Sequence, residues 1–424
     1  MTSCPQCAHQ LVGGQGFVSW CEHCDWNVDP LSVVPAEATP GERAAVQRAH
    51  SLYQQVLRDG PERAPRTGAS LALLALALPV LVFQGAAFAV GAWVVATSAT
   101  WWWKLIVGAP LMLLGLVVVL PPPRNRRQRV VRVAAPEHPD LFELVAQLCQ
   151  AVGAARPRRV VVTDQWRIIA TSARGRVLEI GLPLWAALAP DERRALLARE
   201  LCAYGRVRRS RQRFNDVCVQ VVGLWRDAFR LDYGNRRVSH ATPQMRAEWR
   251  IAGDLNSQRV THRRMLFRWP LEVWSRLIAR VTEHDAWCAA YVADLTAARV
   301  VSADALGRAL AVAYAAQPRY EARVSRWSQN PVADEWWVAI SGLAAGVPAT
   351  EQRRWRRAAQ RADHPEPYAE TPPCGWRLAV LAGAPSEQSR SGAATASIGA
   401  MRAIDDALAL PASALASMLV AGGG

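Results

Sequence analysis

The sequence predicts a mostly helical α+β protein with three parts: a small cysteine-rich domain, a pair of apolar helices and a larger helical domain with a small β-sheet. Three observations predict this fold. Two Cys-x-x-Cys pairs lie within residues 1–28, an almost uncharged apolar stretch covers 69–120, and the rest shows helical periodicity interrupted by short Val-rich segments. A chain of 424 residues has room for two or three such domains.

The chain is strongly basic, with a formal net charge of +15 that comes almost entirely from arginine. Such a charge suits nucleic acid and also the anionic face of a membrane. Nine unevenly spaced cysteines argue against a disulfide framework and for a reducing compartment. The polar, cysteine-rich start has no apolar core behind a basic end, so we expect no signal peptide.

Residues 1–28 hold the most specific motif of the chain. Cys4 and Cys7 form one Cys-x-x-Cys pair and Cys21 and Cys24 form the next, with thirteen residues between the pairs. Two pairs at this separation are typical of a zinc ribbon, in which one tetrahedral zinc joins two knuckles across a hairpin. Four cysteines leave no open coordination position, so the predicted Zn²⁺ is structural. A pair of redox-active dithiols is the alternative, which the double spacing disfavours.

Residues 29–68 are predicted to form a Pro- and Ala-rich linker followed by an amphipathic helix at 42–58. Spacings of three and four residues place its apolar side chains on one face of a helix. That predicted face consists of Ala45, Val46, Ala49, Leu52 and Val56.

Residues 69–120 are almost continuously apolar. A membrane-spanning helix needs about 20 apolar residues. The stretch therefore predicts a two-helix transmembrane hairpin, with helices at 70–94 and 101–120 and a tight turn at 97–100. Trp101–Trp103 would then lie at the membrane interface, where tryptophan is enriched. A buried helical hairpin in a soluble core is the alternative, which the length and the near absence of charge disfavour.

Arginines flank the outer ends of the predicted hairpin, whereas its turn offers only Lys104. Positively charged flanks stay on the cytoplasmic side of a membrane. We therefore expect a multi-pass protein of the cell membrane, with two spanning helices and both termini in the cytoplasm. The reduced thiols of a zinc site agree with that placement.

Residues 130–380 are predicted to form the main domain, and residues 381–424 an Ala-, Gly- and Ser-rich C-terminal segment with one helix at 399–419. Within the main domain, helical periodicity predicts a helix over 141–152. A proline followed by two acids marks the start of another helix, at 190–206. Short strands are predicted at 160–162 and 176–180.

The helix at 190–206 contains Leu197-Ala-Arg-Glu-Leu201, which matches part of the metal-binding helix of a zinc peptidase. Such a helix carries His-Glu-x-x-His: the two histidines lie one turn apart and bind zinc, and the glutamate is the general base. Glu200 matches that glutamate, but Arg199 and Ala203 stand where the histidines would be. The frame of the motif is present without its metal ligands.

Other short motifs lie on both sides of this helix. They are Pro157 before a Val-rich strand, Glu179-Ile-Gly-Leu182, Leu188-Ala-Pro-Asp-Glu-Arg193, Glu248-Trp-Arg-Ile-Ala-Gly-Asp254 and Thr371-Pro-Pro-Cys-Gly-Trp-Arg377. Together with Leu197-Ala-Arg-Glu-Leu201, their order resembles the M48 family of membrane-associated zinc endopeptidases, whose bacterial members often have a transmembrane hairpin ahead of a cytosolic domain. The resemblance covers about 130–380, and Thr371 stands for a late histidine of the family.

The resemblance places the zinc ligands of the family at Arg199, Ala203 and Ala252. It retains only Glu200, as a vestigial general base, and Asp254. Alanine has no donor atom and a charged guanidinium has no free lone pair, whereas a catalytic zinc needs three protein ligands and an open position for water. The resemblance therefore implies a catalytically inactive relative, a pseudoenzyme, and we expect no catalytic zinc.

Arg199 would place a fixed positive charge near the position of the metal. We expect it to pair with Asp254 or Glu248 rather than with Glu200, because adjacent residues on a helix do not face each other. The alternative is that Arg199 extends into the solvent.

Other kinds of site find little support in the sequence. No two of the eight histidines lie within five residues of each other, and no Gly-x-Ser-x-Gly turn is present. Cys202 is interpreted as a small core residue rather than a reactive thiol. The arginine runs at 206–213 and 353–357 are typical of a solvated face, with phosphate groups or anionic lipid as the alternative contact.

Three functions remain open. The first is a membrane-anchored, non-catalytic M48-like protein that binds or regulates a protein partner at the cytoplasmic face of the bilayer. The second is an active membrane metalloendopeptidase or other hydrolase with a displaced site. The third is a nucleic-acid-binding zinc-ribbon protein, which is disfavoured because residues 1–28 contain no arginine or lysine.

Overall fold

The computed structural model describes 3–13, 17–29, 40–61, 69–116, 129–171, 176–206, 283–329, 331–344, 346–365, 371–383 and 398–421, together with Leu277 and Arg280. The predicted positions Glu248, Ala252 and Asp254 lie outside the described residues, as does most of the arginine run at 206–213. The chain forms two compact units. The first comprises Met1–Ala64, Gln128–Arg208 and Ala286–Gly424, and the second comprises Pro65–Arg127 and Arg209–Asp285.

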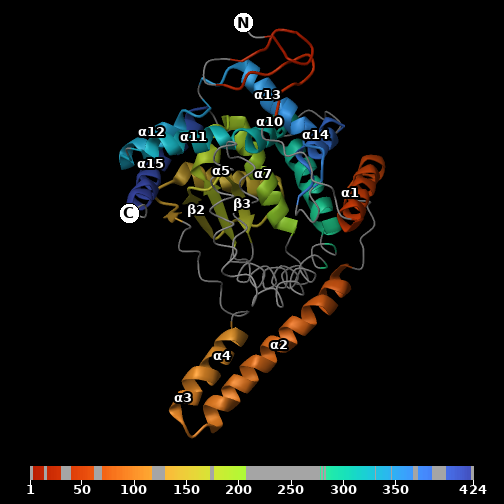
Figure 1. Cartoon of the computed structure of the whole chain (residues 1–424). Coiled ribbons are helices and arrows are strands. Elements are labelled where there is room, and N and C mark those ends of the chain that lie inside the picture. The colour runs from red at the N-terminus through yellow and green to blue at the C-terminus, as the bar shows by residue number, and fades with distance from the viewer. Residues whose placement is uncertain are drawn as a thin grey trace. The chain divides into compact units, whose positions relative to one another are not determined.

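A four-stranded mixed sheet lies in the first unit. Its strands are β1 (Val130–Val133), β2 (Arg159–Thr163), β3 (Ile168–Thr171) and β4 (Val177–Gly181). They are ordered β1-β2-β4-β3; β2 and β4 pair in parallel, and β1 and β3 are antiparallel edge strands (Figure 1). The two predicted strands are the central ones, and Val-rich β2 is buried along its last four residues. The edge strands have four residues each, too few for a clear alternating pattern.

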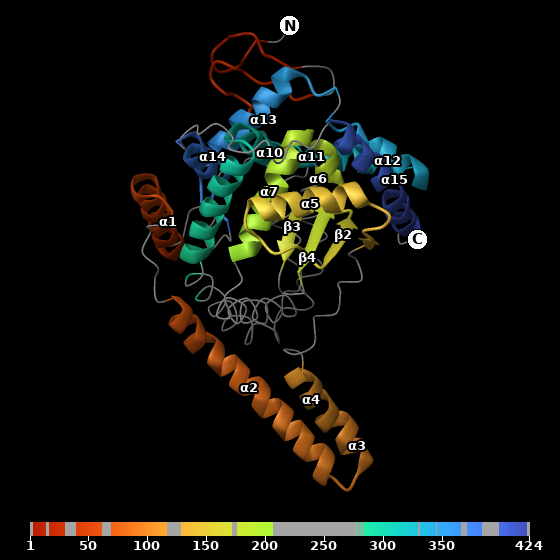
Figure 2. The same ribbon diagram turned by 180° about the vertical axis from the view of Figure 1, so that it is seen from behind.

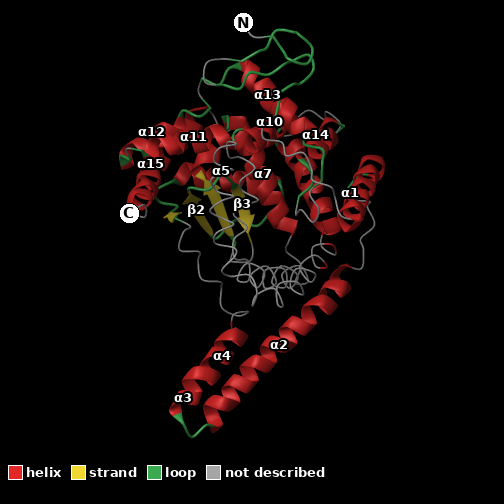
Figure 3. Cartoon of the chain, in the orientation of Figure 1, coloured by secondary structure: helices red, strands yellow, loops and turns green. Residues whose placement is uncertain are grey.

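Helices make up most of the described chain (Figure 3). Those of the first unit are α1 (Pro40–Asp59), α5 (Pro139–Ala151), α6 (Leu182–Ala187), α7 (Pro190–Arg206), α10 (Ala303–Ala315), α11 (Gln317–Ser328), α12 (Ala333–Ser341), α13 (Ala349–Arg361), α14 (Cys374–Ala382) and α15 (Ile398–Ala421). A further helical segment covers 283–300. α5 and α7 match the helices predicted at 141–152 and 190–206 closely.

The main hydrophobic core brings the sheet together with α5, α6, α7, α10, α12 and α15. Ile404, Leu408 and Leu415 of α15 are part of this core. On the same helix, Asp405 accepts hydrogen bonds from the indole of Trp185 at 2.9 Å and from Arg193 at 2.8 Å. The helix predicted at 399–419 is therefore packed into the core of the main domain rather than standing apart in a C-terminal segment.

α1 is the amphipathic helix predicted at 42–58, and most of its predicted apolar face is buried. That face packs on an aromatic cluster formed by the helical segment 283–300 and α14. The packed residues are Ala49, Leu52 and Val56 on one side and Trp287, Tyr291 and Trp376 on the other.

The second unit contains a helical hairpin in which α2 (Ala69–Thr97) lies beside α3 (Trp101–Trp103), the π-helical segment η1 (Lys104–Gly108) and α4 (Ala109–Leu116) (Figure 2). Two glycines permit the close approach of its arms. A Cβ on Gly91 would lie 2.7 Å from the backbone nitrogen of Met112, and a Cβ on Gly108 would lie 2.6 Å from Cγ2 of Val95. Small residues at a helix crossing are typical of helices that pack within a membrane.

Within the described residues, one helix is long and apolar enough to cross a membrane, Ala400–Val420 in α15, and Gly85–Thr97 in α2 is a shorter apolar helix. One face of α15 lies in the core described above. The hairpin instead exposes large apolar side chains, among them Trp93 at 66%, Trp101 at 72% and Ile106 at 66%. The described helices of the hairpin, 69–97 and 101–116, overlap the predicted 70–94 and 101–120, and their crossing of a membrane stays a prediction.

Candidate functional site

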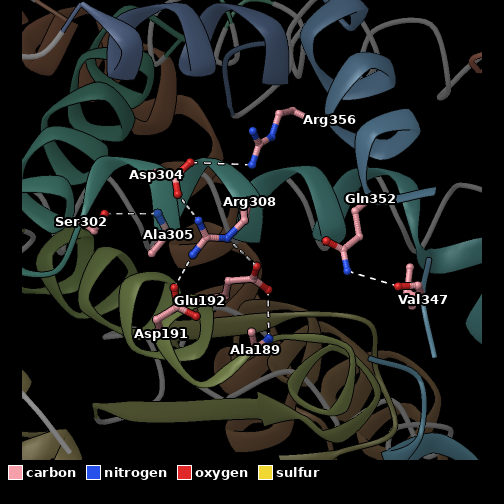
Figure 4. Close-up of polar contacts among 10 residues, drawn as sticks. All are labelled: Ala189, Asp191, Glu192, Ser302, Asp304, Ala305, Arg308, Val347, Gln352 and Arg356. Atoms are coloured by element: carbon pink, nitrogen blue, oxygen red, sulfur yellow. Dashed lines mark hydrogen bonds and ion pairs between the residues drawn. The ribbon is translucent and has the colours of Figure 1, made fainter. Parts of the chain in front are cut away.

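The start of α7 is fixed by charged contacts with α10 (Figure 4). Arg308 of α10 donates hydrogen bonds to Asp191 and Glu192 at the start of α7 and to Asp304 in its own helix. Glu192 also accepts the backbone N–H of Ala189 at 2.9 Å, as in a capping box. Burial raises the pKa of Glu192 above its ordinary value, although these donors oppose the shift. The contacts orient α7 about two turns before Arg199.

The candidate site on α7 is a buried cluster of two arginines and two carboxylates. Arg377 of α14 donates from Nε to Oδ2 of Asp294 at 2.7 Å and from Nη2 to Oδ1 at 2.8 Å. Arg199 donates from Nε to Oδ1 of Asp294 at 3.3 Å, and from Nη1 to the carboxylate of Glu200. Asp294 is fully buried and Glu200 is 6% exposed. We call these four residues the arginine–carboxylate cluster.

The four side chains balance one another electrically, with two positive and two negative charges. A buried carboxylate that lacks a countercharge costs several kcal/mol. Burial alone would lower the pKa of Arg377, but attraction and hydrogen bonding to Asp294 raise it by more, so the net shift is upward. Arg377 therefore remains protonated and supplies a positive charge beside Asp294.

The donor set of this cluster does not fit a catalytic zinc. Asp294 already accepts three hydrogen bonds from guanidinium groups, and Glu200 accepts one from Arg199. A guanidinium offers no lone pair, and Ala203, one turn further along α7, has no donor atom. What the arrangement provides is a fixed, compensated positive charge that links α7 to α14 and to the segment 283–300.

Among the described residues, Arg199 pairs with Asp294. The expected partners Asp254 and Glu248 lie outside the described residues, so that prediction stays untested. The prediction that Arg199 would not meet Glu200 was wrong, because a guanidinium at the end of a long side chain reaches the neighbouring carboxylate. Arg199 does not extend into the solvent either, since its side chain is only 13% exposed.

Two residues of the cluster were not singled out from the sequence. Arg377 closes the motif that begins at Thr371, but that motif gives no partner for it. Asp294 lies 95 residues after Arg199, so their contact is a property of the tertiary fold. The available signal is a single acid in the apolar helical stretch Tyr291-Val-Ala-Asp294, because a charge in such a place is rarely buried without a partner.

The four predicted cysteines come together at the N-terminus. The Sγ atoms of Cys4, Cys7, Cys21 and Cys24 all lie within 4.8 Å of one another, and Cys4–Cys24 and Cys7–Cys21 are each 3.5 Å apart. Tetrahedral zinc with bonds of about 2.3 Å holds its sulfur ligands about 3.8 Å apart. These separations are too long for a disulfide and suit one shared metal ion. We call these four residues the four-cysteine cluster. We call the segment Ser3–Asp29, which contains the cluster, the ribbon.

Both cysteine pairs make the same turn. The residue after each pair, Ala8 or Asp25, has a left-handed backbone with φ of 60° and 55°. The backbone N–H of Cys4 donates to the carbonyl of His9 at 2.7 Å, and that of Cys21 donates to the carbonyl of Trp26 at 3.0 Å. The two turns are joined by a hairpin that pairs Val12 with Trp20.

The thiols of the cluster compete for ionisation. Burial and the neighbouring thiols raise the pKa of Cys24 to about 12, despite a hydrogen bond from the backbone of Trp26. Burial also acts to raise the pKa of Cys4, but the backbone N–H groups of Gln6 and Cys7 and the adjacent thiols lower it to about 7. Four thiolates so close together require a cation to neutralise them. The residues therefore fit a closed, structural metal site.

Comparison with protein-family models, with curated proteins and with solved structures gives no match. The geometry of the two clusters is thus the basis for assigning a function to the chain.

Proposed function

We propose that this protein is a membrane-anchored, non-catalytic relative of the M48 zinc endopeptidases whose main domain binds a protein partner at the cytoplasmic face of the membrane. One observation carries the proposal. Arg199, which takes the position of a zinc ligand in the resemblance, forms ion pairs with Glu200 and Asp294 in the protein interior. A guanidinium thus supplies the positive charge that the metal would supply in an active relative.

The position of Asp294 supports a revised alignment with the family. The resemblance implies an aspartate beside the helix that binds the metal in the family, and the sequence motif placed that aspartate at Asp254. Asp294, preceded by Ala293, lies against Arg199 of α7 and is held by Arg377. We therefore assign the family aspartate to Asp294. The late motif from Thr371 to Arg377 then contributes its arginine to the same cluster.

Membrane anchoring by the hairpin is supported by its packing and its surface. The close approach at Gly91 and Gly108 favours helices that associate without a hydrophobic driving force between them, as in lipid. Exposed side chains such as Trp93, Trp101 and Ile106 would face water at a cost that a bilayer removes. We propose two spans, with the ribbon and the main domain in the cytoplasm, and Zn²⁺ as the metal of the four-cysteine cluster.

A peptidase assay tests the proposal against the active alternative. The full chain is purified in detergent, supplied with zinc and incubated with an unfolded protein substrate, and Glu200→Gln serves as the matched control. We expect no difference in cleavage rate between the two, because Glu200 has no zinc-bound water to activate. Cleavage by the native chain that Glu200→Gln abolishes would contradict the proposal and favour a metalloendopeptidase with a displaced site.

A second measurement tests the anchor. The chain is inserted into lipid vesicles, and single cysteines introduced at Ser98 and Arg402 of a variant lacking other reactive thiols are probed with a membrane-impermeant reagent. We expect the two positions to react from opposite sides of the bilayer. Reaction of both positions from one side would contradict the two-span hairpin while leaving the interpretation of Arg199 intact.

A further inference from the structure

The ribbon contacts the arginine run predicted at 353–357, which lies in α13 (Figure 1). Arg353 donates to Glu22 at 2.8–2.9 Å, and Arg357 and Arg361 both donate to Asp25, at 3.2 and 3.3 Å. These three arginines are spaced four residues apart and therefore lie along one side of the helix. This side of α13 is neutralised within the chain, so the run is not simply a solvated face.

Two further contacts hold the ribbon beside the row formed by Arg353, Arg357 and Arg361. The buried guanidinium of Arg354 donates to the backbone carbonyl of Val28 at 2.8 Å while it also pairs with Glu351 at 2.7 Å. The guanidinium of Arg319 in α11 lies over the ring of Phe17, 4.7 Å from its centroid. All of these contacts join the ribbon to arginines, in keeping with a ribbon that has no arginine or lysine of its own.

The acidic partners on the ribbon are positioned by the metal site. Glu22 directly follows Cys21, and Asp25 directly follows Cys24. Asp25 has the same left-handed backbone as Ala8, which holds the equivalent position in the other knuckle. The conformation that carries both carboxylates to α13 is thus the conformation of the metal-bound knuckle.

Without a metal, the residues of the ribbon itself would hold this conformation poorly. A segment of this size cannot bury enough apolar surface to fold on its core alone, and small metal-binding domains commonly unfold when the ion is removed. In the ion pairs to α13 the arginine side chains are 50–58% accessible, whereas the side chain of Asp25 is 16% exposed in the folded ribbon. Exposed pairs are individually weak, so they would not retain an unfolded ribbon.

We infer that the ribbon and α13 form a metal-dependent latch. Metal bound by the four-cysteine cluster holds Glu22 and Asp25 against the row of Arg353, Arg357 and Arg361. Loss of the metal releases the ribbon and leaves the row as an open cationic surface. The latch requires a metal in the ribbon and is independent of the chemistry at Arg199. An experiment can therefore refute the latch without refuting the proposed function, and can refute the proposed function without refuting the latch.

The test uses arginine-specific modification of the full chain in detergent with phenylglyoxal, read residue by residue by mass spectrometry. Samples are compared with zinc bound, after chelation under reducing conditions, and after zinc is restored. We expect chelation to speed modification of Arg353, Arg357 and Arg361 about twofold to fivefold, in keeping with the loss of exposed ion pairs. Restored zinc should reverse the change. Arg356 is the internal control, because it is equally exposed on the same helix but faces Asp304.

Two matched variants separate the latch from general loosening of α13. Asp25→Asn should raise the reactivity of Arg357 and Arg361 while zinc content stays unchanged, since Asp25 is not a metal ligand. Asp304→Asn should affect Arg356 but leave the row protected. The latch is refuted if chelation removes the zinc without changing the row, or if Arg356 becomes reactive to the same extent as the row.

Discussion

The four-cysteine cluster and the arginine–carboxylate cluster solve one electrostatic problem in two ways. Each gathers side chains whose like charges would repel in the interior. The cysteines are suited to an ion taken from solution, whereas Asp294 and Glu200 are neutralised by guanidinium groups that belong to the chain. The first cluster should therefore depend on metal supply and redox state, and the second should depend on neither.

Metal removal should produce the largest effect, and it should be confined to the ribbon. Structural zinc sites contribute about 10–16 kcal/mol of binding free energy at neutral pH. Chelation should abolish the ordered signals of residues near Trp20 in an NMR spectrum of the selectively labelled full chain, while the helical circular dichroism of the main domain remains. Loss of the helical signal together with the ribbon would mean that the two clusters are not independent.

Substitution of Asp294 should destabilise the main domain strongly and without regard to metal. Asp294→Ala leaves Arg199 and Arg377 buried without a countercharge, and breaking a buried pair of this kind costs about 3–5 kcal/mol. Denaturant unfolding of the full chain, with and without chelator, measures the effect. Asp304→Asn is the matched control: its side chain is 68% exposed, and loss of its pairs should cost less than about 1 kcal/mol. Equal effects of the two substitutions would show that the cluster is not the central ion network described here.

The backbone of the cysteine knuckles allows the ribbon to be strengthened. Ala8 has φ of 60°, a left-handed conformation that costs an L-residue about 1 kcal/mol and costs glycine little. Ala8→Gly should therefore retain zinc about fivefold better in competition with a chelator. Ala8→Val should retain it less well, and the stability of the main domain should change with neither substitution. Weaker retention in Ala8→Gly would indicate that the knuckle does not require this turn.

The smallest expected effect concerns pH, at the contact that orients α7. The pKa of Glu192 is raised in the folded protein, so the folded state binds a proton more tightly than the unfolded state does. This carboxyl group therefore makes the free energy of unfolding fall as pH rises from its ordinary pKa through its raised pKa. Glu192→Gln, which can still cap the helix, should remove that contribution in unfolding curves recorded across the acidic range. If the free energy of unfolding of Glu192→Gln changes with pH as it does in the native chain, the assigned contribution of Glu192 is contradicted.

The sequence predicted most directly those features that depend on residues close together in the chain. The spacing of the cysteines predicted the four-cysteine cluster, and Pro190 with its following acids predicted the start of α7. The turn between α2 and α3 lies where a tight turn was predicted, at 97–100. The partner of Arg199 was not predicted, because Asp294 reaches it only through the tertiary fold.

The ion pairs made by the arginine run in α13 could not be predicted from the sequence either. Five arginines on a short helix suggest a solvated or phosphate-binding face when read alone. Their partners Glu22 and Asp25 lie more than 300 residues earlier, inside a motif whose spacing explains only its cysteines. Complementary charge between an acidic ribbon and a basic helix is visible in the composition, but which arginines meet which acids depends on the knuckle backbone.

Metal content of the full chain tests the central claim most directly. Elemental analysis compares the native chain with a variant in which Cys4, Cys7, Cys21 and Cys24 are all serine, each with and without Glu200→Gln. Our interpretation predicts about one zinc per native chain, none in the four-serine variant and no effect of Glu200→Gln, because the arginine–carboxylate cluster replaces a metal. Retention of about one zinc by the four-serine variant, released by Glu200→Gln, would contradict it and identify a catalytic metal site.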